Sequence, residues 1–194
     1  GEHRDLHSFP TRRSSDLIHH DGTGACNIIG NRVSDLTTAY TNTIANYGIL
    51  NNGTAISGLI SENEVYNLSS TSATTNSTKM VAIGVTSVTQ PLVTKNLVHS
   101  ISNASTSGSL TDPPLADGIL LGAINSGADV INNVIHLGNG QSTDIQFSGV
   151  HLNTNPTSMV NINIQYNTIV LEGIVTSGGI YSFSFLRGDR KSVV

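Results

Sequence analysis

Three ring-bearing residues recur at one phase of a repeat in this chain, and their chemistry suits a sugar or a metal. Tyr66, His99 and His136 each lie three residues after an Asn that opens a short apolar stretch. Flat rings suit carbohydrate faces, and imidazole nitrogen is a common metal ligand. Repetition alone also brings like residues into line. We therefore predict that the three side chains stack on one outer face, as a candidate binding strip, and we assign no metal to them.

Two acidic residues form the second candidate site. Asp112 and Asp117 share the segment "LTDPPLADG" and could converge there. Glycoside hydrolases use carboxylate pairs of this kind. Asp is also common in solvent-exposed loops and turns, and this preference explains both residues without any catalytic role. We therefore keep them as acidic loop candidates and assign no catalytic residue.

The elements that must position these residues repeat along the chain. Five stretches, "GNRVSDL", "ENEVYNL", "KNLVHSI", "NNVIHLG" and "YNTIVLE", each place an Asn two residues before Val or Ile. Successive Asn residues are 32, 33, 37 and 34 positions apart, and they are Asn31, Asn63, Asn96, Asn133 and Asn167. A second signature keeps the same phase through Ile49, Ile83, Ile119, Val150 and Ile180. Such a period indicates a repeat architecture.

The repeat predicts an all-β fold, a parallel β-helix (solenoid) of about five coils of 30–37 residues. The segments are short, β-branched and punctuated by Asn and Gly, whereas helical repeats need a 3.6-residue apolar period. Propeller blades need four strands per repeat, and we find two or three. Residues one repeat apart then stack about 4.8 Å apart. We expect an Asn ladder at a bend, and an inward aliphatic column of Val33, Val65, Val98, Ile135 and Ile169.

Composition excludes several classes of protein. Charged residues make up only 11% of the chain, whereas disordered tracts are usually charged and poor in β-branched residues. Residues 18–188 carry four Lys or Arg against nine Asp or Glu, so no basic patch supports nucleic-acid binding. No apolar run has the length of a membrane span. With one Cys, the chain cannot form an internal disulfide.

Both ends of the chain read as translated sequencing adapter. "HSFPTRRSSDL", His7–Leu17, matches one frame of a common short-read adapter, and "DRKSVV", Asp189–Val194, matches its reverse complement in another frame. We expect residues 1–17 and 189–194 to be adapter-derived and residues 18–188 to be a fragment of a parallel β-helix. Resequencing the source locus without library adapters would test this expectation.

The coils "SENEVYNLSSTS" and "NNVIHLGNG" resemble right-handed parallel β-helix repeat proteins of the pectate-lyase-like superfamily, most of all bacterial secreted or cell-surface members. The resemblance covers residues 18–188 and implies a right-handed solenoid. It also implies an extracellular or cell-surface location and flanking coils in a longer chain. Members of the superfamily include polysaccharide lyases, hydrolases, adhesins and passive stalks, and fold does not choose among them.

The sequence favours a structural or adhesive role, with a polysaccharide or cell-surface glycan as the partner along one face. One alternative is a fragment of a polysaccharide lyase or glycoside hydrolase. The lyases that the fold resembles use acidic calcium ligands, so Ca²⁺ is expected only under that alternative. Another alternative is a glycan-binding module without catalysis. Whether the chain is an enzyme stays open.

Overall fold

The chain folds into β-strands throughout the residues that its computed structural model describes, which are 18–39, 45–54, 56–74, 78–106, 115–124, 126–153, 161–173 and 182–187. The two predicted adapter-derived stretches lie outside these residues, as do Asp112 and Ile180. Within the described part no helix is long and apolar enough to cross a membrane.

The described strands form three sheets, and every pairing between neighbouring strands is parallel. Sheet A contains β1 (Ile18–His20), β4 (Ala45–Asn51), β7 (Lys79–Val85), β10 (Ala116–Gly122), β13 (Phe147–Asn153) and β16 (Phe183–Arg187). Sheet B contains β2 (Cys26–Ile29), β5 (Ser57–Ser61), β8 (Gln90–Thr94), β11 (Ala128–Ile131) and β14 (Ile162–Gln165). Sheet C contains β3 (Arg32–Thr38), β6 (Glu64–Ser70), β9 (Leu97–Asn103), β12 (Val134–Leu137) and β15 (Thr168–Leu171).

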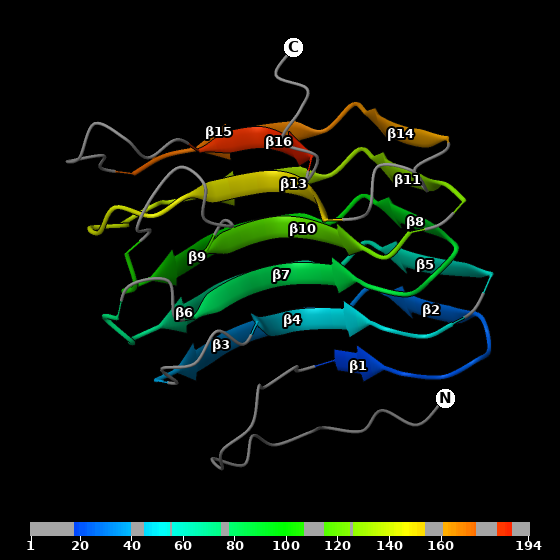
Figure 1. Cartoon of the computed structure of the whole chain (residues 1–194), viewed down its shortest axis with the longest axis horizontal. Helices are drawn as coiled ribbons and strands as arrows, with labels where there is room; N and C mark the ends of the chain where they lie inside the picture. Colours follow the sequence, from blue (N-terminus) through cyan, green and yellow to red (C-terminus); the bar gives the residue numbers. More distant parts are fainter. Residues whose placement is uncertain are drawn as a thin grey trace.

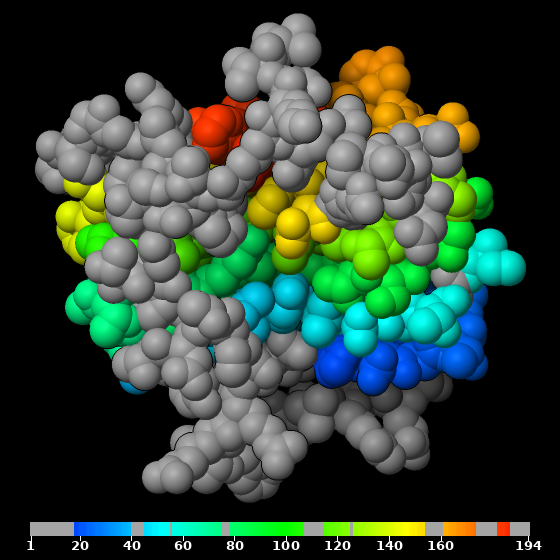
Figure 2. All heavy atoms as spheres, viewed as in Figure 1, coloured from blue at the N-terminus to red at the C-terminus, as the bar shows by residue number. Residues whose placement is uncertain are grey.

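Consecutive strands along the chain enter sheets B, C and A in turn, so the backbone winds as a solenoid (Figure 1). In the space-filling view the coloured coils form successive bands from blue to red along the axis (Figure 2). The all-β parallel solenoid is confirmed, with about four turns rather than the predicted five coils. The difference is small, because five ladder asparagines enclose four intervals, of 32, 33, 37 and 34 residues.

The predicted inward column lies in sheet C as expected. Val65 pairs with Val33 and Val98, and Ile135 pairs with Val98 and Ile169. The first four members are 0–1% exposed, and Ile169 at the end is partly buried against the same core. Burial of these branched side chains contributes roughly 2 kcal/mol each to holding successive coils together.

The second repeat signature forms a column of stacked residues in sheet A. This column differs from the prediction at its last position. Ile49, Ile83, Ile119 and Val150 are stacked in register, and Val150 then pairs with Phe185 instead of the predicted Ile180. The column also begins one strand earlier than predicted, because Ile18 pairs with Ile49. Ile180 was assigned to the column because the "GGIY" motif has the same residue pattern as the other copies of the signature. The register of a sheet is set by strand pairing instead.

Sheet A approaches sheet C closely at positions occupied by glycine. A Cβ atom at Gly118 would lie 2.6 Å from Ile135 Cγ2 and 2.7 Å from the Gly149 carbonyl oxygen. Gly48 and Gly149 face the core in the same way on their own coils. Because Gly118 points inward, the alternation of strand residues turns its neighbour Asp117 to the outer side of the sheet.

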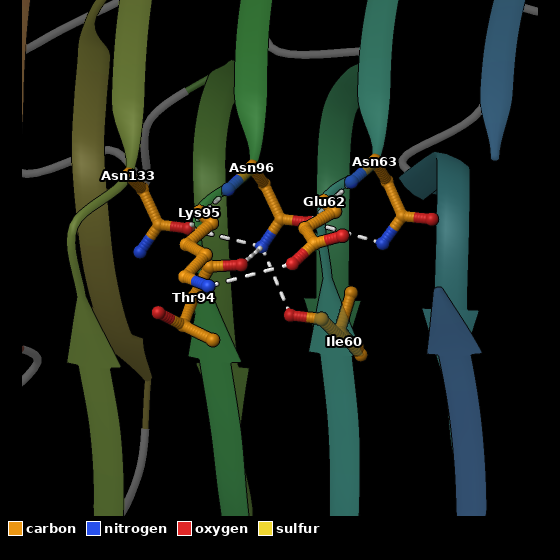
Figure 3. A network of polar contacts seen from close by, with 7 residues as sticks. All are labelled: Ile60, Glu62, Asn63, Thr94, Lys95, Asn96 and Asn133. Carbon is orange, nitrogen blue, oxygen red and sulfur yellow. Dashed lines mark hydrogen bonds and ion pairs between the residues drawn. The ribbon is translucent and has the colours of Figure 1, made fainter. Parts of the chain in front are cut away.

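The corner between sheets B and C carries the predicted asparagine ladder (Figure 3). Asn96 Oδ1 accepts hydrogen bonds from Asn63 Nδ2 at 2.9 Å and from the Asn63 backbone N at 3.1 Å. Asn96 Nδ2 donates to Asn133 Oδ1 and to the carbonyl oxygens of Ile60 and Thr94, each at 3.0 Å. The three inner ladder residues are 0–1% exposed. Every buried amide group at this corner therefore has a partner.

The residue before each ladder Asn adopts a left-handed backbone conformation. These residues are Gly30, Glu62, Lys95, Asn132 and Tyr166, with φ between 56° and 68°. A non-glycine residue pays roughly 1 kcal/mol for this conformation. The recurring strain is offset by the ladder hydrogen bonds that the same turn makes available.

Candidate functional site

The strip of Tyr66, His99 and His136 lies on the outer side of sheet C. Tyr66 pairs with His99 in register, and His99 pairs with His136. The Tyr66 and His99 rings stack with centroids 5.0 Å apart and planes 13° from parallel. The Arg32 guanidinium lies over the Tyr66 ring at 5.0 Å from its centroid. Both faces of the Tyr66 ring and one face of the His99 ring are therefore covered, and these two rings present their edges to an approaching ligand.

Carboxylates border the strip. Glu64 Oε2 lies 2.8 Å from Arg32 Nε, and Glu64 Oε1 lies 3.4 Å from His99 Nε2. His136 Nε2 lies 3.2 Å from Glu172 Oε2, but without hydrogen-bond geometry. Each imidazole is thus directed at a carboxylate from a neighbouring position. Among the described residues, no group of three or more His, Cys, Asp or Glu is placed to hold a metal ion.

The strip could contact a sugar through polar edges. Its outward groups are a phenol, two imidazoles about one-third exposed, a guanidinium and two carboxylates. Such groups hydrogen-bond to hydroxyls. The same groups also stabilise the coil stack through ring stacking and ion pairs, so geometry alone gives them a structural role.

A second cluster lies on the outer side of sheet A, and it is buried. Asp117 was predicted in a loop with Asp112. The structure instead places Asp117 inside β10, with 0% exposure. Asp117 Oδ2 lies 2.6 Å from Lys79 Nζ on β7 and 3.0 Å from His151 Nδ1 on β13. Lys79 Nζ and His151 Nδ1 lie 3.3 Å apart, so the three groups contact one another. We call Lys79, Asp117 and His151 the buried triad.

Two polar atoms beside the triad have no hydrogen-bond partner. They are Asp117 Oδ1 and Ser148 Oγ, both fully buried. Asp117 and Ser148 are register partners on β10 and β13. A buried polar atom without a partner costs about 1–3 kcal/mol. Such atoms are rare enough in native proteins to call for an explanation.

An open pocket lies elsewhere, beside the strands of sheet B. It has a volume of about 470 Å³ and is lined by Gln90, Pro91, Ser126, Gly127, Ala128, Asp129, Asn161, Ile162 and Asn163. Asp129 is its single ionisable lining residue, and Asn163 Nδ2 donates to Asp129 Oδ1 at 3.1 Å. These lining residues could contact a ligand through amide and carboxylate groups. They include no acid–base pair.

Sequence reasoning missed Lys79, His151 and Ser148. The column argument compares residues at one phase of the repeat, and the triad members occupy different phases. Met80, not Lys79, pairs with Ala116, and His151 pairs with Leu120. The available signal was charge: Lys79 is one of four basic residues between positions 18 and 188, and it lies next to a run of apolar residues.

Comparisons of the chain with protein-family models, curated proteins and solved structures find no match.

Proposed function

We propose that this chain is part of the body of a bacterial secreted or cell-surface β-solenoid protein, with a structural or adhesive role. The observation that supports it most is the unbroken asparagine ladder beside the aliphatic columns, which gives each coil the same satisfied contact with the next. In such arrays stability sums over coil interfaces, which suits an elongated, rigid element. Right-handed winding and kinship with the pectate-lyase-like superfamily belong to this proposal.

Flanking coils are the first partners under this proposal. Ile162, Ile164, Ile169 and Leu171 in the last coil are only partly buried, whereas the residues stacked beneath them are buried. Phe185 is 45% exposed. A further coil would cover these side chains and satisfy the free edges of the three sheets.

A polysaccharide or cell-surface glycan is the second partner, with the Tyr66–His99–His136 strip as its contact. The in-register stack with Arg32 and Glu64 supports this choice, because it lines up hydrogen-bonding edges at the spacing of the coils. A lyase or hydrolase is less favoured. Within the described residues Asp117 has a lysine and a histidine beside it but no second carboxylate in contact.

Two measurements test the proposal. An antibody raised against the full chain should label intact cells of the source bacterium, since a surface stalk is accessible without lysis. Labelling that needs permeabilised cells contradicts the surface role. Incubation with neutral and acidic polysaccharides should release no new reducing or unsaturated ends, and reproducible release would favour the enzyme alternative.

A further inference from the structure

The buried triad places an amine against a carboxyl group in a site that is largely shielded from solvent. Lys79 Nζ lies 2.6 Å from Asp117 Oδ2, and the Asp117 side chain has no exposure while that of Lys79 has 15%. The contact joins β7 to β10 on successive coils. Lys95 forms the only other described lysine–carboxylate pair, with Glu62 at 3.4 Å, and both side chains are more than half exposed. The two pairs therefore differ in distance and in access to water.

We propose that Lys79 and Asp117 form an intramolecular isopeptide bond that ties these two coils together. In the reaction the Lys79 Nζ–Asp117 Cγ bond forms, the Cγ–Oδ2 bond breaks, and one water molecule leaves. The ammonium group loses two protons, and both depart with Oδ2. The atoms and the net charge of the ion pair therefore equal those of the amide plus water. The reaction needs no oxidant or co-reactant.

His151 is placed to carry a proton between the reacting groups. Its Nδ1 lies 3.3 Å from Lys79 Nζ and 3.0 Å from Asp117 Oδ2. One proton passes directly from Nζ to Oδ2, which yields a neutral amine and a carboxylic acid. After the amine attacks Cγ, the second proton passes from the nitrogen to Nδ1 and on to Oδ2. General acid–base catalysis of this kind needs only a positioned imidazole.

The two unpartnered atoms lie beside the groups that would react. A carboxylate offers about four acceptor positions, and here Oδ1 uses none of its own. An amide keeps a single oxygen, which in this reaction is Oδ1. Ser148, opposite Asp117 in register, has a free buried hydroxyl that can donate to the charge that develops on Oδ1. Bond formation also removes two charges from a largely buried site, where each ion is costly.

The bond would give this chain a covalent brace that its sequence otherwise lacks. Cys26 is the only cysteine, so no disulfide can link one coil to another. A crosslink between residues 79 and 117 would restrict the unfolded chain as a disulfide does, and it would resist reduction.

Mass spectrometry of the folded full chain tests the proposal. We expect an intact mass lower than the sequence mass by one water molecule, and a branched peptide that joins the segments containing Lys79 and Asp117. The mapping uses the wild-type chain and needs no variant to fold. Folded wild-type chain that keeps its full mass after prolonged incubation would overturn the proposal.

Matched variants separate this bond from other dehydrations, such as succinimide formation at Asp21–Gly22 or at Asp117–Gly118 itself. Lys79→Arg keeps the positive charge but lacks the amine nucleophile, so it should retain the full mass. Lys95→Arg alters the exposed pair and should still lose the water. His151→Gln should slow bond formation by about a hundredfold or more. Loss of water that persists in Lys79→Arg, or that maps away from Asp117, would contradict the assignment.

Discussion

At the corner between sheets B and C, every buried ladder amide has partners on the coils above and below it. On the outer side of sheet A, the buried triad has close ionic contacts, yet Asp117 Oδ1 and Ser148 Oγ have none. Among the residues that the structure describes, the first region repeats from coil to coil and the second occurs once. A repeated, satisfied network serves stability, whereas a single, unsatisfied one is better explained by chemistry. The difference thus separates the scaffold of this molecule from its candidate reactive site.

The largest effect should follow from removing a central ladder residue. Asn96→Ala deletes five ladder hydrogen bonds and leaves the buried Asn63 backbone N–H without its Oδ1 acceptor, so it should lower the free energy of unfolding by about 3 kcal/mol. Urea denaturation followed by circular dichroism measures this loss. Asn167→Ala, at the less buried end of the ladder, is the control and should cost less. Equal losses of stability in the two variants would show that hydrogen bonds to the ladder residues on adjacent coils do not determine the contribution of an asparagine.

A substitution beside the buried triad should instead increase the stability of the fold. Ser148→Ala deletes a buried hydroxyl that has no partner, so it should raise the free energy of unfolding by about 1 kcal/mol. The comparison belongs in the Lys79→Arg background, where no isopeptide bond can contribute to stability. A loss of stability there would mean that Ser148 is satisfied in the folded chain, and the contrast between the two regions would fail.

A smaller effect is expected on the outer strip. Tyr66→Ala removes the ring that stacks on His99 and lies under Arg32, and should cost roughly 0.5 kcal/mol. Tyr66→Phe keeps the ring and should match the wild type in a thermal melt. If both variants also bind polysaccharide as the wild type does, the strip serves the coil stack alone.

The smallest effect concerns the pH dependence at an exposed bend. Hydrogen bonds from the Ser34 hydroxyl, and then from Asn67, hold the pKa of Asp35 below its ordinary value of 3.8. A depressed pKa adds stability above the unfolded-state pKa, and this is lost as the pH falls from about 3.8 through the folded-state value. Asp35→Asn should therefore be slightly less stable than the wild type near neutral pH and equal to it at the acid end. A difference that grows as the pH falls would contradict the assignment.

The scaffold was predictable from sequence, because repetition places the same residue type at the same phase. Asn63, Asn96 and Asn133 predicted the ladder, and Val65 and Val98 predicted the column that the structure contains. The prediction failed at Ile180, where a motif match did not correspond to the strand that pairs with Val150.

The buried triad was not predictable in the same way. Lys79 reaches Asp117 from a position out of register, and Asp117 lies on the outer side of sheet A although its side chain is fully buried. Both features depend on the length of the side chain and on the local backbone geometry. An alignment of residue types at equivalent repeat positions does not encode either of them. The Tyr66–His99–His136 register was predicted, but the stacking of the Tyr66 and His99 rings depends on side-chain torsion angles that the repeat pattern does not encode.

Methyl–methyl nuclear Overhauser effects test the central claim most directly. Val65, Val98 and Ile135 should be vertical neighbours on adjacent parallel strands. Strong cross-peaks are expected between Val65 and Val98 and between Val98 and Ile135. Val65 and Ile135 are two coils apart, about 9.6 Å, so their direct cross-peak should be weak or missing. Missing neighbour cross-peaks in the folded chain would contradict the coil stack, and the ladder and the triad would lose their basis with it.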